Sequence, residues 1–169
     1  MVEIARVASA DDSLHEALCD LLADTVEGGA SVGFVLPLTR DIASRYWRQV
    51  EAALADGLHL WVARSEGRVV GSVQLDPCRK PNAPHRAELM KLLVLRSHRG
   101  RGIGRSLLAA AEAHARAAGR TLLVLDTERG STAEAIYRHL GWHRAGEIPG
   151  YARTPHGKLH PTVYYYKQL

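Results

Sequence analysis

Residues 99–104, RGRGIG, place three glycines between a strand-like apolar run and a helical pattern. The preceding run, residues 86–95, is rich in leucine and valine. After Ile103, small and apolar side chains recur at helical spacing, and Gly119 is typical of a helix end. A strand, a glycine turn and a helix in direct succession are typical of mixed α/β proteins. We therefore expect an α/β fold built around this unit.

The remaining periodicities extend this pattern over the chain, with no internal repeat or long linker, so we expect a single domain at residues 1–169. Ser131 is expected to cap the last helix, with Glu134 reciprocating as in a capping box. Strands are expected at residues 2–7, 58–63, 68–75, 86–95, 121–125, 142–148 and 162–167, and helices at residues 14–26, 41–54, 103–118 and 132–140.

Composition excludes several classes of protein. A net charge of +4 is a mild excess, so we expect no nucleic-acid partner. The sequence has no run of 18 apolar residues, so we expect no membrane span. Residues 1–6 do not resemble a signal peptide. We therefore expect a cytoplasmic protein without a membrane partner. Cys19 and Cys78 are interpreted as free thiols.

The glycine segment also predicts an anion site. The first amides of a helix lack acceptors within it, and the helix dipole adds partial positive charge there. Glycines let the backbone approach a phosphate, and the neighbouring arginines can contact its oxygens. The spacing fits neither the dinucleotide fingerprint nor the P-loop. A simple tight turn remains the alternative at this point.

Two motifs resemble the GNAT superfamily of N-acetyltransferases. Arg99-x-x-Gly102-x-Gly104 resembles its Q/R-x-x-G-x-G/A motif, and residues 135–142, AIYRHLGW, resemble a downstream segment with tyrosine. The resemblance implies a mixed, mostly antiparallel sheet of six to seven strands, about four flanking helices and a splayed central strand pair. It implies acetyl-CoA as co-substrate, held by Arg99, Gly100, Arg101, Gly102, Ile103, Gly104 and Arg105. The pantetheine arm would pair with the backbone near Leu93, Val94 and Leu95.

Further stretches resemble one branch of the superfamily, the tabtoxin-resistance acetyltransferases, which act on a β-lactam amino-acid toxin. They are spread over most of the chain and lie at residues 28–34, 80–82, 86–88, 125–131 and 149–162. This similarity implies a small-molecule amine as acceptor.

Acyl transfer to an amine needs a base for the amine, donors for the carbonyl oxygen and a proton for the departing thiolate. Glu88 is the first candidate for the base, with a surface salt bridge as the alternative. Asp126 is a second candidate, or else a turn cap. Tyr137 matches the family's tyrosine and is the candidate acid, although an aromatic on such a helix is often a core residue. An amide near Leu93 or Val94 is the candidate oxyanion donor.

The acceptor is expected between residues 28–34 and 149–162, with Ser31, Phe34, Tyr151 and His160 as candidate contacts. The alternative for His160 is that it only supports its own loop before Pro161. No histidine motif predicts a metal. A protein N-terminal or lysine acetyltransferase, and a non-catalytic acyl-CoA sensor, are the competing functions. A homodimer would agree with the superfamily, where dimers are common.

Overall fold

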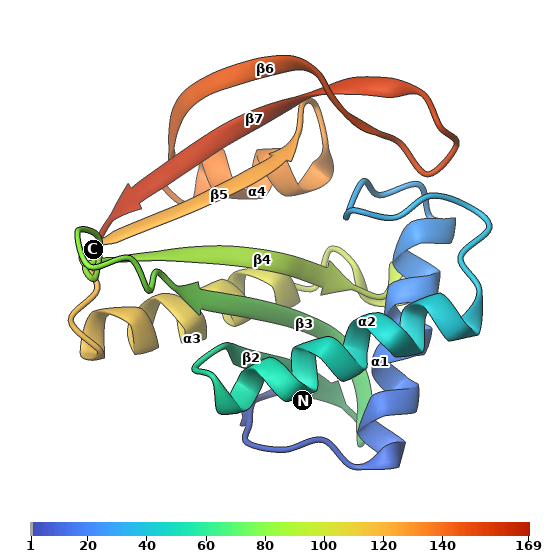
Figure 1. Ribbon diagram of the computed structural model, residues 1–169. Helices are drawn as coiled ribbons and strands as arrows, with labels where there is room; N and C mark the ends of the chain where they lie inside the picture. The colour runs from blue at the N-terminus through green and yellow to red at the C-terminus, as the bar shows by residue number, and fades with distance from the viewer. Residues whose placement is uncertain (1) are drawn as a thin grey trace.

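The computed structural model describes residues 2–169, which form a seven-stranded sheet in the order β1-β2-β3-β4-β5-β7-β6 (Figure 1). Within these residues β4 and β5 run parallel, and every other neighbouring pair is antiparallel. The strands are β1 (Val2–Val7), β2 (His59–Ser65), β3 (Arg68–Pro77), β4 (Arg86–Val94), β5 (Leu122–Glu128), β6 (His143–Arg153) and β7 (Leu159–Gln168). The helices are α1 (Asp12–Glu27), α2 (Arg40–Ala55), α3 (Ile103–Ala117) and α4 (Thr132–His139).

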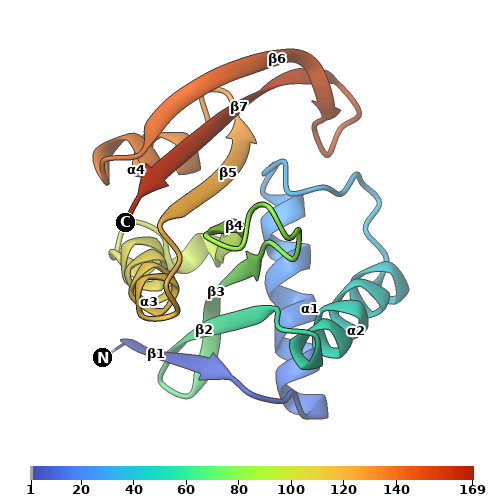
Figure 2. The same ribbon diagram turned by 60° about the vertical axis from the view of Figure 1, so that its left-hand side comes forward.

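Helices cover both faces of the β2–β3–β4 part of the sheet, with α1 and α2 on one side and α3 on the other (Figure 2). Strand alternation divides the side chains between the two layers. In β2, Leu60 and Val62 pack in the cluster with α1 and α2, whereas Trp61 and Ala63 pack in the cluster with α3. The expected α/β architecture is confirmed.

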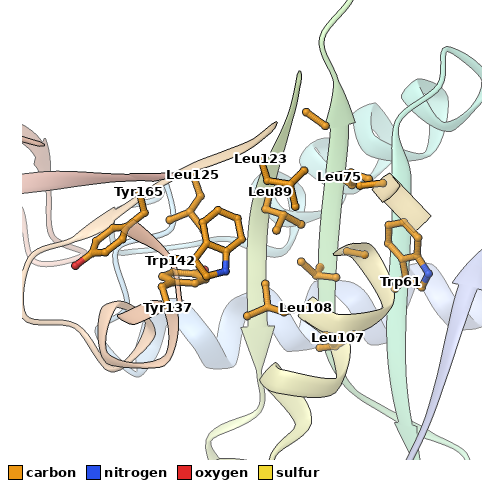
Figure 3. Close-up of a cluster of buried hydrophobic side chains, with 14 of the residues drawn as sticks. Trp61, Leu75, Leu89, Leu107, Leu108, Leu123, Leu125, Tyr137, Trp142 and Tyr165 are labelled. Carbon is orange, nitrogen blue, oxygen red and sulfur yellow. The ribbon is translucent and has the colours of Figure 1, made fainter. Parts of the chain in front are cut away.

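The α3 cluster continues under the C-terminal strands. Figure 3 shows Tyr137 and Trp142 beside Leu125 of β5 and Tyr165 of β7. Leu125 and Tyr165 are cross-strand partners, and both are almost fully buried. This packing fixes α4 against the sheet on the face that α3 also covers.

Local sequence determines where the helices begin. The Ser131 hydroxyl accepts from the Glu134 amide at 3.1 Å, as expected for an N-cap. Glu134 accepts from the amide of Gly130 at 2.6 Å, and not from Ser131 as a standard capping box requires. No helix within residues 2–169 has the length and apolar character needed to cross a bilayer.

The sequence interpretation was wrong about the length of the last two strands. Residues 149–161 were expected as a connecting segment, but most of them belong to β6 and β7. A register shift between Ile148 and Ala152 accommodates Pro149 and Gly150, whose φ is 60°, and pairing resumes at Ala152 with His160. A β-bulge admits a proline and a glycine that usually signal a turn.

Candidate active site

The glycine turn leads directly into α3. A short 3₁₀ turn at Arg96–His98 precedes it, and Gly100 and Gly102 have φ of 75° and 76°. Gly102 occupies the N-cap position without a side-chain cap, and the first bond of the helix runs from the Ser106 amide to the Gly102 carbonyl at 3.1 Å. The amides of residues 103–105 therefore have no acceptor within the helix, and a bound anion can accept from them.

The arginines around this turn have different positions. The side chains of Arg99 and Arg105 line the cavity described below, together with His98. Arg101 donates to the Ser97 carbonyl at 3.1 Å and does not line the cavity. Arg96 binds the Asp24 carboxylate at 2.8 Å and so ties the turn to α1.

The central strands separate beside this turn. β4 and β5 pair only over Arg86–Leu122, Ala87–Leu123 and Glu88–Val124. Beyond these pairs, β5 continues alongside β7 alone. The expected splay is therefore confirmed. It opens a cavity of about 950 Å³, near the upper end of the range for ligand pockets. Of the residues predicted for the site, those that line it are Ser31, Glu88, Val94, Arg99, Gly100, Gly102, Ile103, Gly104, Arg105, Asp126 and Tyr137.

This cavity fits a long ligand with a phosphate group at one end. The donors and positive charges of the glycine turn lie at one side of it, and Leu92 and Val94 line its wall in the splay. The apolar wall suits an extended arm such as pantetheine. So does the edge of β4 beyond Glu88, which β5 does not pair with. Residues 99, 100 and 102–105, together with Leu92 and Val94, are thus the cavity residues that could hold acetyl-CoA.

Two other predicted cofactor contacts do not line the cavity. Leu93 is fully buried in the cluster of α1 and α2, and its cross-strand partner is Ser72. Leu95 donates its amide to the Val70 carbonyl at 2.9 Å. Side chains of successive residues alternate along β4, so Leu92 and Val94 face the cavity while the residue between them does not.

Glu88 and Asp126 both line the cavity from the neighbouring strands β4 and β5. The pKa of Glu88 is raised by burial, and further by the nearby carboxylates of Asp126 and Asp76. Burial also raises the pKa of Asp126, while Lys91 opposes this shift. Carboxylates with raised pKa values in a cavity are suited to accept a proton near neutral pH.

Tyr137 comes from α4 and lines the same cavity, although only 7% of its surface is exposed. Its ring packs between Trp142 and Tyr165, with centroids at 5.8 Å and 6.5 Å. Burial, with a smaller effect of Asp126, raises its pKa well above the ordinary value of 10.0. The phenol therefore holds its proton at neutral pH and can donate it.

The predicted acceptor residues lie around one side of the cavity, and only Ser31 lines it. The Ser31 hydroxyl lies 2.8 Å from His160 Nε2, so His160 contacts the site through Ser31. Phe34 packs edge-on against Tyr46 at 5.2 Å. Tyr151 is 49% exposed and accepts a hydrogen bond of 2.8 Å from Tyr164, the cross-strand partner of Asp126.

Lys91 also lines the cavity, although the sequence interpretation assigned it no part in the site. It has a φ of 51° at an irregularity of β4 and lines the cavity near both carboxylates. A lysine within an apolar strand could have marked Lys91 as a site residue. The sequence alone does not show which face of the sheet its side chain occupies.

Comparison with known proteins identifies the family. Residues 19–142 match the acetyltransferase (GNAT) family. An uncharacterized N-acetyltransferase of Azospirillum brasilense, encoded in the hisH-hisA intergenic region, is 39% identical over 115 residues, or 67% of each chain. Human N-acetyltransferase 8B is 37% identical over 93 residues, which span 54% of this chain and 41% of the human protein.

Solved structures of acetyltransferases share this fold. The ribosomal-protein-alanine N-acetyltransferase of Brucella melitensis has a TM-score of 0.78 at 26% identity, covering 100% of this chain and 99% of that one. An acetyltransferase structure from Salmonella typhimurium with its cofactor acetyl-CoA has a TM-score of 0.78 at 19% identity, with coverage of 99% and 94%. The chain belongs to the GNAT family of acetyl-CoA-dependent N-acetyltransferases.

Proposed function

We propose that the protein transfers the acetyl group of acetyl-CoA to the amine of a small molecule, by direct attack in a ternary complex. One observation carries this proposal: Glu88, Asp126 and Tyr137 line the same cavity as the glycine turn. A cavity with two candidate bases and a candidate acid has the groups that the chemistry requires.

Each group has a distinct role in this proposal. Acetyl-CoA supplies the activated acetyl group as a thioester. Glu88, directly or together with Asp126, takes the proton that the attacking amine loses. Tyr137 gives its proton to the departing sulfur, and the strand edge at Val94 supplies an amide for the carbonyl oxygen. Positioning of the two substrates in one cavity accounts for much of the acceleration.

A small acceptor is favoured by the contacts that cross one side of the cavity. The loop between α1 and α2 meets the β6–β7 hairpin through Ser31 with His160 and through the Leu36 amide, which donates to the Pro155 carbonyl at 2.8 Å. These contacts restrict the room for an extended peptide. Within this class we propose amino acids, including β-lactam amino acids, because residues 28–34 and 149–162 resemble the tabtoxin-resistance branch.

A second candidate is acetylation of protein N-termini. It is favoured by the likeness to the Brucella melitensis enzyme, whose name specifies alanine of a ribosomal protein and whose structure matches over the whole chain. The chemistry at Glu88, Asp126 and Tyr137 would be the same, so only the acceptor distinguishes the two functions.

The test is release of CoA thiol from acetyl-CoA in the presence of an amine panel. The panel contains the proteinogenic amino acids, a β-lactam amino acid, polyamines and peptides with N-terminal alanine. We expect turnover with a small amine. Turnover with the peptides alone would support the second candidate, and acetyl-CoA binding without turnover on any amine would indicate an acyl-CoA sensor.

A further inference from the structure

Lys91 lies at a β-bulge that changes the direction of its side chain. In the pairing of β3 with β4, Gln74 faces Met90 and Ser72 faces Leu93, so two residues of β4 oppose the single Val73. Lys91 is one of these two and has a φ of 51°. A bulge of this kind re-aims one side chain relative to strict alternation.

The direction that results is toward the layer of α1 and α2. Met90 packs in the cluster of these helices, and Leu92 packs in the α3 cluster. Lys91 Nζ lies 5.7 Å from the ring centroid of Tyr46 on α2 and close to Gly33 of the α1–α2 loop. Strict alternation after Met90 would have turned Lys91 toward α3. The bulge instead places its ammonium beside the α1–α2 loop, where the acceptor is expected.

The surroundings hold this ammonium in place without neutralising it. Tyr46 is fixed by the Gln74 amide, which donates to its hydroxyl at 2.9 Å, and by the edge of Phe34. Lys167 shows the contrast, because its ammonium lies 2.7 Å from the Glu112 carboxylate. Among residues 2–169 no carboxylate forms such a pair with Lys91, which is half-buried.

An unpaired, half-buried ammonium is unfavourable, because burial removes water that nothing replaces. Burial lowers the pKa of Lys91, while Asp126 and Glu88 act in the opposite direction. These carboxylates are close enough to influence the ammonium but form no ion pair with it. The cavity therefore offers negative charge at Glu88 and Asp126 and positive charge at Lys91, side by side.

We infer that Lys91 binds the carboxylate of the acceptor, so that the substrate is an amine carrying a free carboxylate nearby, as in an α-amino acid. This inference rests on the proposed acetylation of a small amine. The ammonium of such a zwitterion lies toward Glu88 and Asp126, where it loses its proton, and its carboxylate lies toward Lys91. A peptide N-terminus lacks this carboxylate and is discriminated against.

The experiment compares each amino acid of the panel with its carboxamide, using wild-type enzyme and three variants. Lys91→Met removes the charge and keeps the length, and Lys91→Arg keeps the charge. Lys80→Met, in the exposed loop after β3 and outside the cavity, removes a charge as a control. For wild-type enzyme we expect the best amino acid to exceed its amide about 10- to 100-fold in kcat/KM, as for a charge-assisted contact.

Lys91→Met is expected to remove this preference by raising KM for the acid. The loss on the amide should be smaller and arise only because Lys91 lowers the pKa values of the two candidate bases. Lys91→Arg should keep part of the preference and Lys80→Met all of it. Equal rates of wild-type enzyme on acid and amide, or equal losses on both in Lys91→Met, would overturn the role of Lys91 only. Absence of acetylation on every small amine would instead overturn the proposed function.

Discussion

The hydroxyl of Ser31 lies 2.8 Å from Nε2 of His160, although 129 residues separate them in sequence. Nδ1 of His160 lies 2.9 Å from the Pro161 carbonyl, which can only accept, so Nδ1 carries the proton. In the neutral ring Nε2 therefore accepts from Ser31. This bond joins a cavity residue of the α1–α2 loop to the β6–β7 hairpin.

Ser31→Ala tests whether that bond shapes the acceptor site. Loss of one hydrogen bond of this kind should raise KM for the acceptor about 2- to 10-fold, while the Kd of acetyl-CoA stays unchanged. Ser44→Ala is the matched control, because this variant loses a comparable hydrogen bond, the 2.9 Å contact between Ser44 and His15, at a place away from the cavity. Steady-state kinetics and CoA titration measure both, and an equal acceptor KM in the two variants would contradict this role.

Glu88→Gln is expected to change the pH dependence of the rate. A base must be deprotonated, so kcat/KM should rise with pH through the pKa of Glu88, which burial and the neighbouring carboxylates raise above 4.5. In Glu88→Gln this acidic limb should disappear, and the rate should fall about 100-fold or more. A pH–rate profile identical to that of wild-type enzyme would exclude Glu88 as the base.

The same substitution should stabilise the fold at neutral pH. Because the folded pKa of Glu88 is raised, the folded chain holds the proton more tightly than the unfolded chain. This contribution to stability is present below pH 4.5 and is lost as the pH rises through the folded pKa. Glu88→Gln should therefore raise Tm at pH 8 relative to wild type and leave it nearly unchanged at pH 4, as thermal denaturation would show.

Some parts of the site could be predicted from the sequence, and others depend on how the strands pair. The turn at residues 99–104 was predictable because glycines and arginines at fixed offsets determine their local structure. The direction of Lys91 was not, because it follows from the register of β4 against β3. The same holds for residues 149–161, where pairing with a neighbouring strand overrides the turn preference of Pro149 and Gly150.

Tyr137→Phe tests the proposed acid. Burial keeps its phenol protonated, so removing the hydroxyl should lower kcat about 100-fold with little change in the Kd of acetyl-CoA. Tyr165→Phe is the control, since the hydroxyl of Tyr165 on β7 donates to Glu134 of α4 at 2.8 Å. Because the acceptor is a carboxylate, that variant should lose about 2 kcal/mol of stability and keep its kcat. An unchanged kcat in Tyr137→Phe would remove the acid role.

The arginines beside the glycine turn should contribute unequally to cofactor binding. Arg105 lines the cavity, whereas Arg101 donates to the Ser97 carbonyl and lies outside it. Arg105→Ala should therefore raise the Kd of CoA about 10-fold, in line with the loss of a charge-assisted contact, and Arg101→Ala should change it less than about 2-fold. The Arg105 contribution should weaken with added salt, because exposed charges are screened. Titration of CoA at two ionic strengths measures both effects, and equal losses in the two variants would show that charge around the turn matters and position does not.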